Sequence, residues 1–195
     1  CACPHLTYVV RVLPEANDKP EFAPIGAEWY YCDPDRETGN PLSEYEKFVV
    51  KRDTTIEGKT CKIIESQHSS EIMYDENGKV FYRFGNDFKL IYDFTANVGD
   101  TIKFEFKSHS VNSYIIDTTY QVLCVVTKIE SEIIDNEKIR KFFTTLIKYD
   151  SLNHVLWPKY YNYLERIGFE YEFIHKISVP TTDGPHTLRC YQDSD

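Results

Sequence analysis

Short apolar and aromatic runs alternate with polar residues along most of the chain, and turn-forming residues separate the runs. The clearest unit is residues 74–84, where two aromatic runs flank Asn77-Gly78. An Asn-Gly pair supplies the two positive-φ residues of a type I′ turn, so this stretch predicts a β-hairpin. The alternation predicts one face with Tyr74, Val80, Tyr82 and Phe84 and another with Phe81 and Arg83.

The same device recurs along the rest of the chain. Strand pairs are predicted over 45–66, 88–106 and 114–149, and single strands over 6–13, 25–31, 168–173 and through Leu188 and Tyr191. Within 88–106, Ile102 and Phe104 alternate with Lys103 and Glu105, which is typical of a strand with one dry face and one wet face.

These elements predict a mainly β fold with little helix, the exception being a short helix over 160–165. Sequential hairpins favour an antiparallel meander that curls into a barrel or half-barrel, and a two-sheet β-sandwich is the alternative. Residues 1–24 are expected to form an N-terminal segment and connector. Residues 25–195 are expected to form a single β domain, since a chain of 195 residues suits one core.

Composition and charge narrow the possible partners. Aromatic residues make up 15% of the chain, with 15 Tyr and 12 Phe, which favours pleated sheets over helices. The net charge is -9, and no Lys/Arg cluster is available to replace the counterions of phosphates. Nucleic acid is therefore excluded as a partner, and an anionic membrane surface is a poor one. The sequence contains no apolar run of about 18 residues, so no membrane-spanning helix is predicted.

The six cysteines point to a compartment outside the cytoplasm. A bacterial lipoprotein begins with Cys after signal cleavage, so Cys1 is a predicted lipidation site. The expected contact with a membrane is then limited to this lipid anchor. The alternative is that Cys1 is an arbitrary start of the sequence. The expected location is the periplasm, the outer membrane or the cell surface. Cys61 and Cys190 are a predicted disulfide that would staple the C-terminal strand to the sheet.

Several short segments together resemble a known group of proteins. They include Ile25-Gly26 before Trp29, Gly78-Lys79-Val80, Val98-Gly99-Asp100-Thr101, Glu165-Arg166-Ile167-Gly168 and Leu188-Arg189-Cys190-Tyr191. In this succession the chain beyond residue 24 resembles uncharacterised exported and lipoprotein β domains of Bacteroidota. The resemblance implies an exported β fold. It implies no activity, because none is established for that group.

The sequence contains none of the catalytic motifs that would predict an enzyme. The spacings of nucleophile elbows, phosphate loops, zinc-protease helices and dinucleotide fingerprints are missing from the sequence, and neither a cofactor nor a metal site is predicted. Cys124 and His154 could meet in space, but Cys124 belongs to an apolar strand. Glu170 and Glu172 could supply glycosidase carboxylates, although their alternation favours a solvent-facing position. We therefore expect a protein that is not an enzyme.

A dense aromatic group is the candidate binding site. Trp157, Tyr160, Tyr161 and Tyr163 lie where the hairpin rhythm breaks, and exposed aromatic residues of this kind bind sugars or small apolar molecules. The expected function is a non-enzymatic, exported binding or envelope-structural module. A lipocalin-like barrel that carries a small apolar ligand and a carbohydrate-binding or glycoside-hydrolysing protein are the alternatives.

Overall fold

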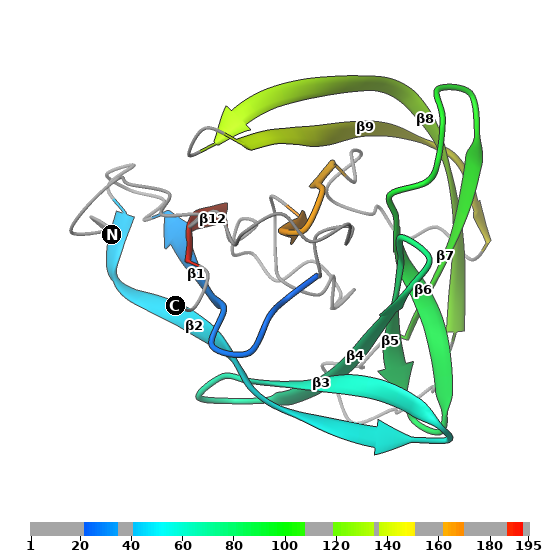
Figure 1. Ribbon diagram of the computed structural model, residues 1–195. Coiled ribbons are helices and arrows are strands. Elements are labelled where there is room, and N and C mark those ends of the chain that lie inside the picture. Colours follow the sequence, from blue (N-terminus) through cyan, green and yellow to red (C-terminus); the bar gives the residue numbers. More distant parts are fainter. Residues whose placement is uncertain are drawn as a thin grey trace, which may run out of the picture.

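The computed structural model describes residues 22–34, 41–107, 119–134, 137–150, 162–169 and 187–192. Within these stretches the chain forms twelve strands and no helix. The strands make two antiparallel sheets, each curled into a half-barrel (Figure 1). The predicted mainly β, antiparallel, barrel-like fold is therefore confirmed.

The larger sheet has seven strands in the order β12-β1-β2-β3-β4-β5-β6. Its strands are β1 (Glu28–Pro34), β2 (Pro41–Ile56), β3 (Lys59–Glu65), β4 (Ser70–Glu76), β5 (Lys79–Phe84), β6 (Asp87–Asp93) and β12 (Thr187–Gln192). From β1 to β6, neighbours in the sheet are also neighbours in the chain, as a meander requires. Only β12 comes from far along the chain, and it pairs with β1 so that Trp29 lies opposite Tyr191.

The smaller sheet has five strands in the order β11-β10-β9-β8-β7. Its strands are β7 (Thr101–Lys107), β8 (Thr119–Ile134), β9 (Glu137–Asp150), β10 (Tyr163–Leu164) and β11 (Gly168–Phe169). The long strands β8 and β9 form the predicted hairpin. Figure 1 shows the two sheets curving around a shared interior, with β10 and β11 lying inside it.

Local turn chemistry explains two of the hairpins. Glu57-Gly58 and Asn77-Gly78 all have positive φ, from 51° to 77°, as type I′ turns demand. The second turn also fixes the register, which places Tyr74 opposite Phe81 and Asp75 opposite Val80. Directly paired residues share a face, so Tyr74 lies with Phe81 and not with Val80 as predicted.

The predicted pairing within 88–106 is wrong, because β6 and β7 belong to different sheets. The connection between them is tied to β8 instead of turning back onto β6. Gly99 N donates to Val126 O at 2.8 Å, and Val126 N donates to Asp100 O at 2.9 Å. The chain therefore leaves one sheet at Asp93 and starts the next at Thr101.

The core is rich in aromatic residues and takes residues from both sheets. Its largest fully buried side chains are Trp29, Tyr31, Tyr92, Tyr163, Phe104 and Phe142. Burying one such side chain contributes roughly 2–3 kcal/mol. Phe22 and Ala23 are also part of this core, so the β domain includes residues that we expected in the connector before residue 25.

Candidate functional site

The structure describes only one of the four aromatic residues predicted to bind a ligand. Outside the described residues lie Trp157, Tyr160 and Tyr161, and also Cys1, His154, Glu170 and Glu172. Tyr163 is fully buried, its hydroxyl donates to Asp93 O at 3.0 Å, and its ring stacks on Phe142 at a centroid distance of 4.8 Å. The structure thus places Tyr163 in the core and does not support a ligand-binding role for it.

The predicted helix over 160–165 is wrong in its described part. Tyr163 and Leu164 form β10, which pairs with Phe142 and Lys141 of β9, and the next residues turn into β11. Pairing with a long strand supplies hydrogen-bond partners to a segment too short to form a stable helix alone. Residues 162–169 therefore form a small hairpin, which we call the inner hairpin.

The inner hairpin lies between the half-barrels (Figure 1). Its backbone is held by side chains of the larger sheet: Trp29 Nε1 donates to Ile167 O at 2.9 Å, and Phe169 N donates to the Tyr92 hydroxyl at 3.1 Å. Each bond gives a hydrogen-bond partner to a backbone group of a buried residue. The inner hairpin is therefore tied to the larger sheet from within the interior.

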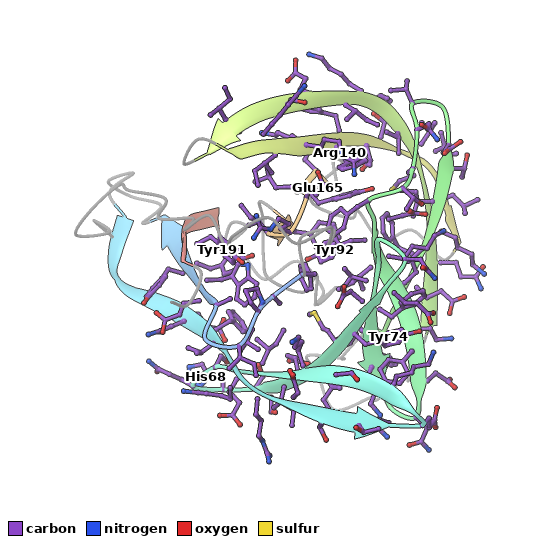
Figure 2. All side chains as sticks on the ribbon, viewed as in Figure 1. His68, Tyr74, Tyr92, Arg140, Glu165 and Tyr191 are labelled. Carbon is purple, nitrogen blue, oxygen red and sulfur yellow. The ribbon has the colours of Figure 1, made fainter. Side chains whose placement is uncertain are left out.

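An ion pair fastens the inner hairpin to β9. Arg140 donates to both carboxylate oxygens of Glu165, at 2.9 Å from Nε and 2.5 Å from Nη2, and Nη2 also donates to Phe94 O at 2.7 Å. These two side chains lie next to one another beside the interior (Figure 2). The hydrogen bond with Glu165 raises the pKa of Arg140. A bidentate geometry of this kind is the strong form of the arginine–carboxylate contact.

Asp93 anchors the same region from the end of β6. Its carboxylate accepts hydrogen bonds from Thr95 N at 2.9 Å and from Thr95 Oγ1 at 2.6 Å, and it pairs with Lys79 Nζ at 2.8 Å. Burial acts to raise the pKa of Asp93, but the bonds from Lys79 and Thr95 outweigh it, so the pKa is lowered. Asp93 is therefore held as a carboxylate.

Cys61 and Cys124 are two thiols whose side chains the structure describes. Cys61 and Cys124 are both free and fully buried. Burial raises the pKa of Cys61 and raises that of Cys124 to about 12. Because the thiolate is the nucleophile, these values do not favour catalysis by either cysteine.

The structure also corrects the predicted disulfide between Cys61 and Cys190. Cys190 lies opposite Tyr30, which lies opposite Lys47 of β2, whereas Cys61 lies opposite Thr54 of β2. The two cysteines are thus three strands apart, about 14 Å, and also separated by roughly 20 Å along the strands. A disulfide requires Cα atoms within about 7 Å.

A surface on β3–β6 combines aromatic rings with cations. We define this outer aromatic face as Lys59, Tyr74, Phe81, Arg83 and Phe88. Tyr74 stacks on Phe81 at a centroid distance of 4.8 Å, and Phe88 meets Tyr74 edge-on at 4.7 Å. Tyr74 is buried, whereas Phe81 and Phe88 are half-buried and keep part of their rings exposed.

The outer aromatic face lies on the side of the sheet opposite to the core. The register pairs Tyr74 with Phe81, while the alternate residue Val80 is fully buried in the core cluster. The signal for this face is therefore in the sequence: a two-residue Asn-Gly turn dictates that Tyr74 and Phe81 are cross-strand partners.

Two cations complete this face. Lys59 Nζ lies 4.4 Å from the centre of the Tyr74 ring, and its hydrogen bond with Tyr74 raises the pKa of Lys59. Arg83 lies opposite Phe88 in the β5–β6 register. Aromatic rings beside fixed positive charges suit a ligand that has an apolar face together with hydroxyl or acidic groups.

Among the described residues, no three His, Cys, Asp or Glu side chains converge as metal ligands. The described residues also form no helix that is long and apolar enough to cross a membrane.

In comparisons with known proteins, no family model, no curated protein and no solved structure matches the chain.

Proposed function

We propose that this protein is a non-enzymatic binding or envelope-structural module that works outside the cytoplasm, and that it binds a glycan on the outer aromatic face. One observation carries the proposal. The inner hairpin occupies the interior with its buried residues Leu164, Ile167 and Phe169, whereas Phe81 and Phe88 keep part of their rings at the surface. A ligand thus meets rings and cations on the outside of the larger sheet.

Glycan chemistry matches these side chains. The C–H face of a sugar ring packs on an aromatic ring, and the hydroxyl or acidic groups of a glycan accept hydrogen bonds from Lys59 and Arg83. The inner hairpin, which lies inside the barrel-like interior, does not favour the lipocalin-like alternative, which needs a cavity of several hundred Å³. The hydrolase alternative depends on Glu170 and Glu172, which lie outside the described residues.

Location outside the cytoplasm is supported by the resemblance to exported proteins and is tested separately. Cell fractionation of the native host, with an antibody against the chain, should detect it in the envelope or in the medium. Detection in the cytoplasmic fraction alone would contradict this part of the proposal, and it would leave glycan binding to its own test.

The binding proposal is tested with a glycan array, followed by titration of the best glycan. We expect Phe88→Ala to weaken binding about 2- to 10-fold, the worth of one aromatic contact. Phe143→Ala is the matched control, because Phe143 is also half-buried and has Lys141 Nζ 5.2 Å from its ring centre, but it lies on the other sheet. The proposal fails if no glycan binds above the blank or if both variants bind like the wild type.

A further inference from the structure

Arg83, on the outer aromatic face, has a hydrogen-bond donor that the described residues leave unused. Arg83 is half-buried, and its Nε is buried and has no hydrogen-bond partner in the described part of the chain. An unpaired buried N–H is costly, so nearly all such groups in native proteins have an acceptor. Because a guanidinium can only donate hydrogen bonds, a ligand that brings an acceptor to Arg83 would recover this cost.

Carboxylates of the protein do not supply that acceptor. The chain has 31 acidic residues and a net charge of -9, and on the neighbouring strand β6 Lys89 Nζ lies 2.8 Å from Glu105 Oε2. Arg83 and Lys59, in contrast, form no ion pair with any carboxylate in the described stretches. The exposed Glu76 acts on Lys59 through its charge alone. The outer aromatic face thus keeps two positive charges available to a ligand in a protein that is acidic overall.

The two cations act on the same part of this face. Lys59 Nζ lies 4.4 Å from the centre of the Tyr74 ring. The register of β3 and β4, continued by one residue, places Cys61 opposite Tyr74. Burial raises the pKa of Cys61, whereas a backbone hydrogen bond and the charges of Arg83 and Lys59 act to lower it. Both positive charges are therefore close to the Cys61–Tyr74 pair at the centre of the face.

We propose that Arg83 determines the specificity of the outer aromatic face by binding the carboxylate of an acidic sugar, so that the glycan is one that contains uronic acid. This inference rests on the proposed glycan binding and names its class of ligand. The planar fork of a guanidinium matches the two oxygens of a carboxylate. Phe88 lies opposite Arg83 and keeps part of its ring exposed, so it can support the C–H face of the same sugar.

Charge separates this ligand from other anions. A phosphate backbone is bound by a series of cations, and the outer aromatic face has only Lys59 and Arg83 for that purpose among its defined residues. The net charge of -9 also repels a densely charged polymer at long range. A single carboxylate needs one guanidinium at short range, and its sugar ring needs an aromatic surface beside it. A glycan with spaced carboxylates fits both conditions.

Pairs of oligosaccharides that differ only in charge test the inference. The probes are short oligosaccharides of galacturonate, glucuronate and mannuronate, each titrated against the full chain beside its own methyl ester, which keeps the ring and removes the negative charge. We expect at least one uronate to bind and its ester to bind about 10-fold or more weakly, as the loss of a charge-assisted hydrogen bond implies. Equal binding of uronate and ester, or binding of neutral glycans alone, overturns the inference and leaves glycan binding standing. Binding of no glycan overturns both.

Variants assign the role to Arg83. Arg83→Gln should weaken binding of the uronate about 10-fold or more and leave binding of the ester within about 2-fold. Arg83→Lys, which keeps the charge and loses the fork, should recover only part of the affinity. Arg52→Gln is the matched control, because Arg52 is exposed on β2 of the same sheet, three strands from Arg83, at about 14 Å. If Arg52→Gln weakens uronate binding as much as Arg83→Gln does, with circular dichroism spectra like that of the wild type, Arg83 does not determine specificity.

Discussion

Replacing Gly168 with Ala tests how closely the inner hairpin packs against the larger sheet. Gly168 has a φ of +96°, and an added Cβ would lie 2.5 Å from the Tyr92 hydroxyl oxygen and 2.8 Å from Tyr92 Cζ. Tyr92 is only 1% exposed and has little room to move. Gly58 is the matched control, since its φ is +76° and a Cβ there would meet no heavy atom within 4 Å.

The two substitutions share one cost and differ in another. A side chain at positive φ costs about 1–2 kcal/mol in either position. Overpacking against Tyr92 adds about 1–3 kcal/mol in Gly168→Ala alone. We therefore expect Gly168→Ala to lower the free energy of unfolding by about 2–5 kcal/mol and Gly58→Ala by about 1–2 kcal/mol.

Urea unfolding followed by circular dichroism and tryptophan fluorescence measures both values. Tyr92→Phe removes the hydroxyl oxygen, the nearest of the atoms that the new Cβ would strike, and keeps Cζ at 2.8 Å, so it relieves part of the overpacking. It also leaves Phe169 N without its hydroxyl partner, at a cost of about 1–3 kcal/mol. In the double variant Gly168→Ala/Tyr92→Phe, the loss in the free energy of unfolding should be smaller than the sum of the losses in the two single variants. We expect the difference to be at least about 0.5 kcal/mol. The reasoning is refuted if Gly168→Ala and Gly58→Ala cost the same.

Three further predictions concern charges and thiols. Arg140→Gln should lower the free energy of unfolding, measured in urea, by about 1–2 kcal/mol, since Glu165 loses its partner at a site that solvent screens only in part. Unchanged stability would show that this ion pair does not stabilise the inner hairpin against β9. Because folding lowers the pKa of Asp93 below its ordinary 3.8, its stabilising effect is present above about pH 4 and is lost as the pH falls through the lower folded value. Asp93→Asn should flatten the dependence of unfolding free energy on pH between about pH 5 and 3, and parallel curves for variant and wild type would count against it. Iodoacetamide at pH 8 should leave Cys61 and Cys124 unmodified in the native protein and should label both in urea, as read by peptide mass; rapid native labelling would show that they are not buried.

The hairpins were predictable because their information is local. Asn77-Gly78 carries both the turn and the register of β4 and β5 in two adjacent residues. Alternation continued through the turn without its pairing rule assigns Val80, in place of Phe81, to the face of Tyr74. With that rule, Tyr74 and Phe81 fall on one face, and the outer aromatic face follows from sequence.

Elements that depend on distant partners could not be predicted in this way. Tyr163 belongs to a Tyr-rich stretch that suits a binding loop, and only its pairing with Phe142 and its bond to Asp93 O place it in the core. The split between β6 and β7 depends likewise on Val126, whose backbone binds Gly99 and Asp100. Tertiary partners outweigh local preference at these positions.

The pairing of β1 with β12 has a consequence for the order of folding. Glu28 and Gln192 are partners, so β1 can pair on one side with β2 long before β12 has been synthesised. Until then the outer edge of β1 presents unpaired backbone groups to any other extended chain. Closing so long a loop is also slow, because its entropy must be lost before the contacts form. A chain truncated before residue 187 would therefore keep an unpaired edge at β1. We expect such truncated chains to aggregate through this edge.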